Sequence, residues 1–456
     1  MGGKGAFQSA FLEGSISASL LGYIAPVAIS LMTQALYSLT DLWVVGRYAG
    51  SASIAAVASG GQVIALLTSV ITGLATGATV RIANVIGQGK PVIAEDIAAA
   101  EIRLMAAVTA LITLVMFFGA AGISRAMNAP PEALGAMTAY IRICGGGMLF
   151  VSAFNVISGF YRSIGNSRIT LAFVLASSLV NLLGDLILVG AFHQGAAGAA
   201  AATVFSQFVS LGLSIISLRK GRLPFKVKAF SGRSGRGEIL NIARVGFPIV
   251  INDLLTGISI LIVISIINDL GLAAAASVGI AEKLFIFLVL VPTAFLQGLA
   301  AFVAQNAGAG QLGRANQSLG VSLQISLACG VLMFLLTYFM GGELAGCFEK
   351  DPVIIDSARA YLKAGAFEYL FLSVTYCLQG YLSGIGKTRL IMLIGFISAF
   401  GVRVPLTYLV SRLPDADMFQ MGLVVSASAG VNLVLHLAYY IVKYGKRRLA
   451  LWRKLY

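Results

Sequence analysis

Charged residues are scarce in this sequence. Asp, Glu, Lys and Arg make up 11% of the 456 residues, whereas 58% are hydrophobic. A soluble fold cannot bury so large an apolar fraction, because its surface needs polar cover. Uncharged runs of about 20 residues, enough to cross a bilayer as a helix, recur along the whole chain. The composition therefore predicts an all-α polytopic membrane protein.

Histidine and cysteine are also few. The four cysteines show no CxxC spacing, which argues against a disulfide framework or a zinc site. The two histidines, His193 and His436, lie far apart, near the ends of apolar runs. An intramembrane enzyme would need a nucleophile with a base, or a metal cluster. We therefore expect neither an enzyme nor a bound cofactor.

Positive charge exceeds negative charge, with a formal net charge of +14. With a cytoplasmic N-terminus and about twelve spans, roughly 22 of the 32 Lys and Arg fall on cytoplasmic segments and roughly seven outside. The densest clusters, 219–236 and 443–454, lie on the predicted inner face, where they set topology and contact anionic lipid. We expect a multi-pass cell-membrane protein with both termini cytoplasmic, the bilayer as a partner and no nucleic acid partner.

The chain divides into two halves. The break between the sixth and seventh apolar runs is basic, contains Gly and Ser, and reads as a linker. We expect an N-terminal six-helix lobe at 1–218, a cytoplasmic linker at 219–238, a C-terminal six-helix lobe at 239–444 and a basic tail at 445–456. The predicted spans are 16–45, 52–80, 97–122, 133–160, 167–191, 196–218, 239–267, 272–303, 317–341, 353–382, 389–411 and 418–442.

The two halves are internal repeats. An offset of 221 aligns Gly87 with Gly308, and Pro26 and Pro248 stand 222 apart. Because each half has an even number of spans, the repeats are parallel and related by an axis along the membrane normal. Two such pseudo-symmetric lobes can rock and open an intervening cleft to either side, which is alternating access. Pro26 is a candidate conformational bend, because a proline removes one helical hydrogen bond; a plain packing kink is the alternative.

Two spans carry carboxylates at depth. Gln34, Tyr37 and Asp41 stand at i, i+3 and i+7, on one face of the first span, and Asn181 and Asp185 stand at i and i+4 on the fifth. An unpaired charge in hydrocarbon costs about several kcal/mol, so such residues face a bundle interior or a water-filled cavity. We therefore expect these side chains to line an interior site.

Several stretches together resemble one transporter family. In chain order they are Pro26 with Gln34-Ala-Leu-Tyr-Ser-Leu-Thr-Asp41-Leu-Trp-Val-Val-Gly46, Gly87-Gln-Gly89, Asn155 before Gly159-Phe-Tyr-Arg162-Ser-Ile-Gly165-Asn, Asn181-Leu-Leu-Gly-Asp185 and Gln305-Asn306-Ala-Gly308-Ala. Each is weak alone. Taken in order, they resemble the multidrug and toxic compound extrusion (MATE) transporters over essentially the full length, and most of all the prokaryotic members.

The resemblance implies export of organic compounds, driven by a proton or sodium gradient. It also implies a coupling-ion site in the N-terminal lobe built from two aspartates, two asparagines and nearby hydroxyls. By position, the ion-binding residues are Asp41, Asn155, Asn181, Asp185 and Thr203, lined by Gln34, Tyr37 and Tyr140.

The carboxylate pair supports this implication on physical grounds. Two aspartates in a small, partly dehydrated site do not both stay ionised, because like charge and desolvation oppose it, and the pair titrates as a unit. Such a pair can hold a proton near neutral pH. The same oxygens, with Asn and Thr groups, can instead coordinate Na⁺, so the residues leave both ions open.

The C-terminal lobe lacks this site. At the same offset, Asn155, Asn181 and Asp185 become Tyr376, Val402 and Leu406. This lobe instead carries possible substrate or ion contacts at Asp253, Glu282, Glu368 and Arg403. Internal pairing of Glu368 or Glu282 with Arg403 or Lys283 is the alternative interpretation, and Asp253 is the leading candidate for substrate contact.

Two other functions are open. A flippase for a lipid-linked substrate shares the two-lobe architecture, but handling pyrophosphate calls for several Arg or Lys in the cleft, and here the N-terminal lobe offers acids. A receptor or scaffold would not require a buried Asp pair. An acidic, amphipathic cavity favours small organic cations, although Arg403 and Lys283 could admit zwitterions or anions. No oligomeric state is predicted.

Overall fold

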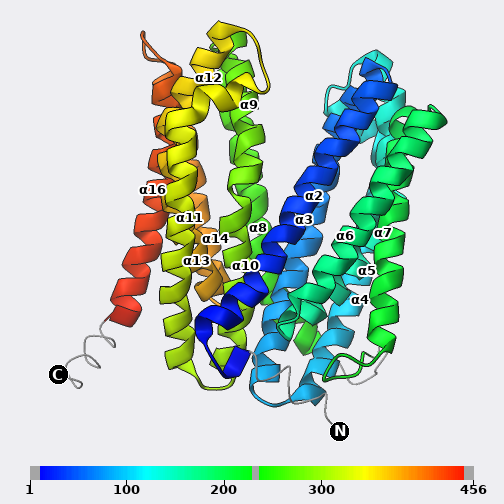
Figure 1. Ribbon diagram of the computed structural model, residues 1–456, viewed down its shortest axis with the longest axis vertical. Coiled ribbons are helices and arrows are strands. Elements are labelled where there is room, and N and C mark those ends of the chain that lie inside the picture. The colour runs from blue at the N-terminus through cyan, green and yellow to red at the C-terminus, as the bar shows by residue number, and fades with distance from the viewer. Residues whose placement is uncertain (1–10, 228–235, 446–456) are drawn as a thin grey trace. The chain divides into compact units, whose positions relative to one another are not determined.

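The computed structural model describes residues 11–227 and 236–445. The predicted tail at 445–456 lies outside the described residues except for its first residue, and so does 228–235 of the predicted linker. Every described element is a helix (Figure 1).

The first half of the chain forms six spans. These are α2 (Ile16–Tyr48), α3 (Ser51–Gly87), α4 (Pro91–Ala126), α5 (Pro131–Ser163), α6 (Ser167–Asp185) continued by the π-helical segment η1 (Leu186–Ala191), and α7 (Gly195–Arg219). Each predicted span of this half coincides with one of these helices. The helices extend past the predicted limits because their polar ends still satisfy backbone hydrogen bonds, which an apolar-run criterion does not detect.

The second half repeats this order with more interruptions. Its elements are α8 (Arg236–Asn268), α9 (Leu272–Leu288) with α10 (Leu290–Gly308), α11 (Leu312–Gly346), α12 (Pro352–Gly365) with α13 (Phe367–Gly384), α14 (Thr388–Phe396) with η2 (Ile397–Arg403) and α15 (Val404–Ser411), and α16 (Met418–Tyr440) with η3 (Ile441–Gly445). Eleven helices within the described ranges are long and apolar enough to cross a membrane. The α12–α13 pair covers the remaining predicted span, so the prediction of an all-α protein with about twelve spans is confirmed.

The repeat is visible in the turns. Gly89 and Gly310 follow equivalent helices with φ of 72° and 74°, and Gly165 and Gly386 do so with φ of 82° and 75°. Both pairs are 221 residues apart. A left-handed backbone strains residues with a side chain, which is why glycine occurs at each of these helix ends.

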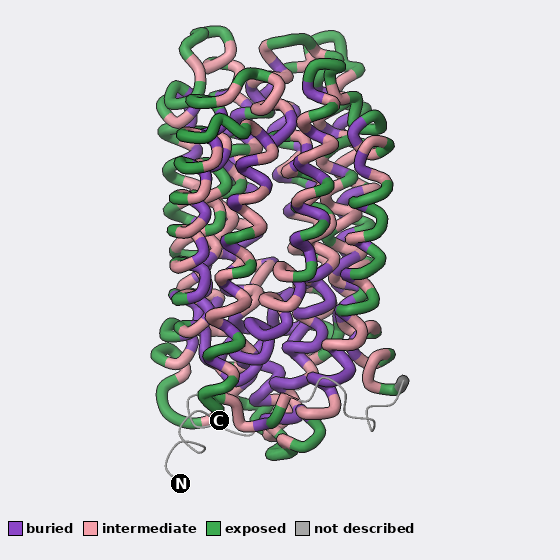
Figure 2. Tube along the Cα trace, turned by 90° about the vertical axis from the view of Figure 1, so that its right-hand side faces the viewer, coloured by how far each residue is buried: buried purple, intermediate pink, exposed green. Residues whose placement is uncertain are grey.

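The chain forms two compact units, which we describe separately. The first comprises Met1–Val250 with Ala304–Leu312, and the second comprises Ile251–Val303 with Gly313–Tyr456. The first unit therefore contains the beginning of α8 and the end of α10, in addition to the first six spans. The lobe boundaries predicted from chain order follow the two repeats of the sequence, whereas these units follow contacts between residues. The boundaries therefore stay a prediction. Buried residues gather on the faces that neighbouring helices turn to one another (Figure 2).

Small residues explain why α3 binds these two additional segments. Gly77 lies against the backbone of Gly246 in α8, where a Cβ would approach the Gly246 nitrogen to 2.6 Å. At the end of α3, a Cβ on Gly87 would overlap the carbonyl oxygen of Gln305, and one on Gly308 would overlap that of Asn84. The two contacts are reciprocal, because the offset of 221 residues relates Gly87 to Gly308 and Asn84 to Gln305.

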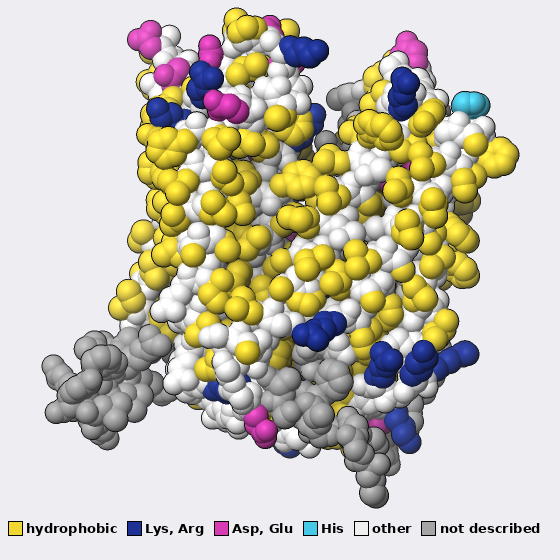
Figure 3. Space-filling view, viewed as in Figure 1, with side chains coloured by type: hydrophobic (Ala, Val, Ile, Leu, Met, Phe, Trp, Pro, Cys, Tyr) yellow, Lys and Arg dark blue, Asp and Glu magenta, His cyan; other side chains and the backbone are white. Residues whose placement is uncertain are grey.

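The surface of each unit fits a bilayer. Hydrophobic side chains cover the middle of the helices, and Lys and Arg lie toward their ends (Figure 3). Large apolar residues such as Leu111, Phe118 and Phe205 are exposed at 63%, 75% and 57%. Such exposure is expected where lipid, not water, contacts the side chain.

Candidate functional site

The carboxylates of the first unit come together from neighbouring helices. Asp41 projects from α2, and Asp185 is the last residue of α6; both are buried. Asn181 donates from Nδ2 to Thr203 Oγ1 at 3.4 Å, and Thr203 Oγ1 donates to Asp41 Oδ2 at 3.5 Å. Asp41 also interacts electrostatically with Asp185. The structure therefore assembles Asp41, Asp185, Asn181 and Thr203 in one place.

Local packing positions this cluster. Gly184 precedes Asp185, and a Cβ there would lie 2.9 Å from Ala202 Cβ, so the glycine lets α6 approach α7 beside Thr203. Directly after Asp185 the helix widens into the π-helical segment η1. Such segments often occur at functional sites, because the wider turn changes the direction in which side chains project. Close packing at Gly184 and a change of helical geometry after Asp185 thus coincide at this cluster.

The cluster has more hydrogen-bond acceptors than donors. Among the described residues, neither oxygen of Asp185 has a hydrogen-bond donor, and Asp41 Oδ1 and Asn181 Oδ1 also have none. Asp185 has 0% exposure, so bulk water does not supply a donor. Two uncompensated carboxylates at this depth would cost many kcal/mol, and a buried group neutralises or binds a cation instead. The geometry fits a proton shared by the two carboxyl groups, or a small cation held by these oxygens.

Two predicted lining tyrosines lie near the pair. Tyr37 and Tyr140 both interact electrostatically with Asp41. Tyr140 packs its ring against Gly60 of α3, where a Cβ would lie 2.7 Å from the ring. Tyr140 is buried and Tyr37 half-buried, so both can shape the site without carrying charge.

Two other predicted residues make local contacts instead. Asn155 Nδ2 donates to the carbonyl oxygen of Val151 on its own helix, at 2.9 Å. Gln34 is exposed and donates to the Ser30 carbonyl at 3.2 Å. The structure thus does not bring Asn155 or Gln34 into hydrogen-bond contact with the pair, because both side chains bond back to their own helices. Pro26 lies inside α2, which is continuous through it.

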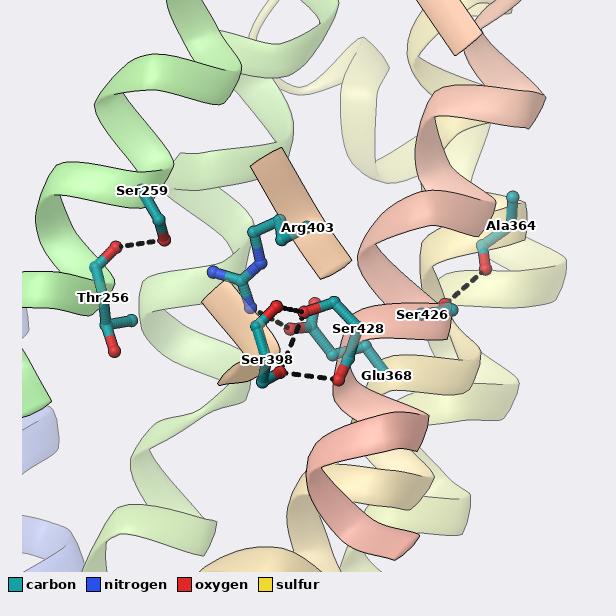
Figure 4. A network of polar contacts seen from close by, with 8 residues as sticks. All are labelled: Thr256, Ser259, Ala364, Glu368, Ser398, Arg403, Ser426 and Ser428. Atoms are coloured by element: carbon teal, nitrogen blue, oxygen red, sulfur yellow. Dashed lines mark hydrogen bonds and ion pairs between the residues drawn. The ribbon is translucent and has the colours of Figure 1, made fainter. Parts of the chain in front are cut away.

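The charged residues of the second unit form another cluster. Glu368 Oε1 lies 3.8 Å from Arg403 Nη2 (Figure 4). Glu282 also interacts electrostatically with Arg403. Lys283 instead lies over the Phe348 ring, 5.9 Å from its centroid. Of the internal ion pairs that the sequence left open, the structure therefore shows the one between Glu368 and Arg403.

Asp253 does not join an ion pair of this kind in the described chain. Its Oδ1 accepts a 3.5 Å hydrogen bond from the side-chain amide of its neighbour Asn252. Asn252 in turn lies against Gly395 of α14, where a Cβ would overlap its Oδ1. The role of Asp253 as a substrate contact stays a prediction.

The sequence reasoning missed Glu101, the only acid within the predicted span 97–122. Glu101 in α4 is 1% exposed, and neither of its carboxyl oxygens has a hydrogen-bond partner among the described residues. It faces Gly159 of α5, where a Cβ would lie 3.9 Å from Oε1, and interacts electrostatically with Arg162. The signal was available, since the rule that singled out Asp41 applies equally to a lone carboxylate in this span.

Comparison with known proteins places this site in context. The MatE family model matches residues 26–187 and 248–409, two stretches of equal length whose first residues are 222 positions apart. The chain is 23% identical over 452 residues to the probable multidrug resistance protein YoeA of Bacillus subtilis, with 95% of this chain and 96% of YoeA covered. It is 24% identical over 437 residues to a FAD transporter of Shewanella oneidensis, with 94% of each covered.

One solved structure shows how far the fold is shared. A MOP superfamily transporter from Pyrococcus furiosus, described as having a binding pocket of reverse polarity, matches with a TM-score of 0.90 at 18% identity. The match covers 99% of this chain and 98% of that one. At this level of identity the similarity shows the fold.

Proposed function

Because the chain belongs to the MATE family of membrane transporters, we propose that it exports organic compounds by antiport against H⁺ or Na⁺, through alternating access. The family is one of transporters, so the chain is not an enzyme. The coupling ion, the substrate class and the orientation in the membrane belong to the proposal.

The observation that carries the proposal is the shortage of donors around Asp185 and Asp41. Four buried acceptor oxygens on Asp41, Asp185 and Asn181 lack a donor among the described residues, and a proton or Na⁺ would satisfy them. An ion that binds only when the site faces one side couples its own movement to that of the substrate. The protein then exchanges substrate for ion if the two bind to different conformational states of the protein.

We propose amphipathic organic cations as substrates, because the site of the first unit carries acids and no base among its assembled residues. The name of YoeA, a probable multidrug resistance protein, supports export of drug-like compounds in general, without naming their charge. The FAD transporter in the same set of relatives is a reason to test anionic compounds as well. We propose the cell membrane as the location, with both termini cytoplasmic, from the distribution of Lys and Arg.

The alternative is a flippase for a lipid-linked or amphipathic substrate. It would need several cationic side chains to hold a pyrophosphate group. The buried cluster of the second unit offers one, Arg403, beside two carboxylates. This balance favours export of soluble amphipathic compounds.

The proposal is tested by efflux from liposomes. The purified protein is reconstituted, and efflux of a fluorescent cationic dye is measured under a proton gradient without sodium, and then under a sodium gradient without a proton gradient. We expect one gradient to drive flux, Asp41→Asn to abolish it, and Asp415→Asn, on an exposed loop, to leave it unchanged. Absence of flux under both gradients from folded protein would refute antiport of this dye class, and a headgroup-accessibility assay would then test lipid flipping.

A further inference from the structure

Arg403 is a largely buried cation whose guanidinium donates no hydrogen bond to another residue in the described part of the chain. It lies about 20 Å along the helix from Thr388, well inside a membrane span, and 14% of its side-chain surface is exposed. A guanidinium has five N–H donors in a rigid fork. Its 3.8 Å contact with Glu368 is too long for a hydrogen bond, and Nε has no acceptor among the described residues. A buried charge in a membrane span that leaves donors free is unusual and suggests a missing acceptor.

The segment that carries Arg403 is anchored by contacts that do not involve its guanidinium. Ser398 Oγ donates to the Ser428 carbonyl at 2.8 Å, and Ser428 Oγ donates to the Ser398 carbonyl at 3.0 Å, which ties η2 to α16 (Figure 4). Ser426 in turn ties α16 to α12 by donating to the Ala364 carbonyl at 2.7 Å. Arg403 ends η2, so a rigid support presents its fork while leaving the fork itself available.

The surrounding charges define what the fork can accept. Glu368 and Glu282 both interact electrostatically with Arg403, so the three groups carry a net charge of −1 when all are ionised. A simple anion or a phosphate would add to this excess. A zwitterion adds no net charge, since its carboxylate can bind the guanidinium while its cationic group lies near Glu282, the carboxylate left over from the Glu368–Arg403 pair. A planar carboxylate also matches the fork in two parallel hydrogen bonds.

We propose that Arg403, flanked by Glu368, is a substrate subsite that recognises the carboxylate of zwitterionic amphipathic compounds. The inference refines the substrate class of the proposed exporter and rests on that function. The subsite is confined to the second repeat, because Arg403 corresponds to Leu182 in the first at the 221 offset. It is separate from the Asp41–Asp185 cluster, which lies in the other compact unit.

The test is equilibrium binding of two matched dyes to the purified full-length chain in lipid nanodiscs. One is a rhodamine with a free carboxylate, which is a zwitterion, and the other is its methyl ester, a cation of nearly the same size. Fluorescence polarisation gives both affinities. In Arg403→Lys, which keeps the charge but loses the fork, we expect the acid to bind about tenfold more weakly and the ester to be unchanged. Glu368→Gln provides a change of opposite sign, with the acid binding severalfold more tightly and the ester more weakly.

The outcomes separate the possibilities. Equal losses for acid and ester in Arg403→Lys, no change for either, or failure of the acid to bind the wild-type chain would each overturn the subsite. If Arg403→Lys does not fold, Glu368→Gln decides, and parallel shifts of both dyes refute the proposal. Binding requires no ion gradient, so a failure of antiport in liposomes with the dye discrimination intact would remove the transport mechanism and leave the subsite.

Discussion

Replacing Gly308 by alanine should destabilise the protein, because the new methyl group would overlap the carbonyl oxygen of Asn84. That oxygen is backbone, so no side-chain rotation relieves the overlap, and the ends of α3 and α10 must separate. Overpacking of this kind costs about 1–3 kcal/mol. Separation also stretches the 3.2 Å hydrogen bond from Asn84 Nδ2 to the Ala304 carbonyl, which contributes about 1 kcal/mol. The gain in helix propensity is at most about 1 kcal/mol, so the net loss is about 1–3 kcal/mol.

Unfolding of the purified protein in detergent, by heat or denaturant, measures this loss. Gly122→Ala is the matched control, because a Cβ at Gly122 in α4 meets nothing within 4 Å, and it should stabilise by about 0.5–1 kcal/mol. Combining Gly308→Ala with Gly87→Ala should cost less than the sum, since both open the same reciprocal contact. A Gly308→Ala protein as stable as Gly122→Ala would refute the close approach of α3 and α10.

Two further substitutions test buried polar groups by the same unfolding measurement. Glu101→Gln should cost under about 1 kcal/mol of unfolding free energy, because a carboxyl without donors is held neutral and an amide replaces it closely. A loss of about 3–5 kcal/mol would show instead that an ionised Glu101 balances Arg162. Ser398→Ala should cost about 1–3 kcal/mol by removing the hydroxyl that bonds Ser428, whereas Ser411→Ala, at an exposed hydrogen bond, should cost little. Equal effects of the two serine substitutions would contradict the anchoring of η2.

The sequence predicted which residues of the N-terminal site could meet, but not which of them do. Helical spacing placed Asp41 on the face of Tyr37, and Asn181 on the face of Asp185. Asn155 belongs to the same family pattern, yet its amide bonds to Val151 on its own helix. Composition does not resolve this choice, since an asparagine in a helix can bond back to its own turn or across to a neighbour, and the free-energy difference is small.

By itself, the sequence determined the membrane class, the number and approximate limits of the spans, the internal repeat and the candidate acids, because each depends on periodicity and on the cost of charge in hydrocarbon. Only the tertiary structure decided which helices approach closely enough to share a compact unit, as α3 does with parts of α8 and α10 through Gly77, Gly87 and Gly308. It also decided which buried groups lack a hydrogen-bond partner, as the carboxyl oxygens of Asp185 and Glu101 and the Nε of Arg403 do within the described chain. Both properties depend on contacts between residues distant in sequence, and helical periodicity carries no information about distances between helices.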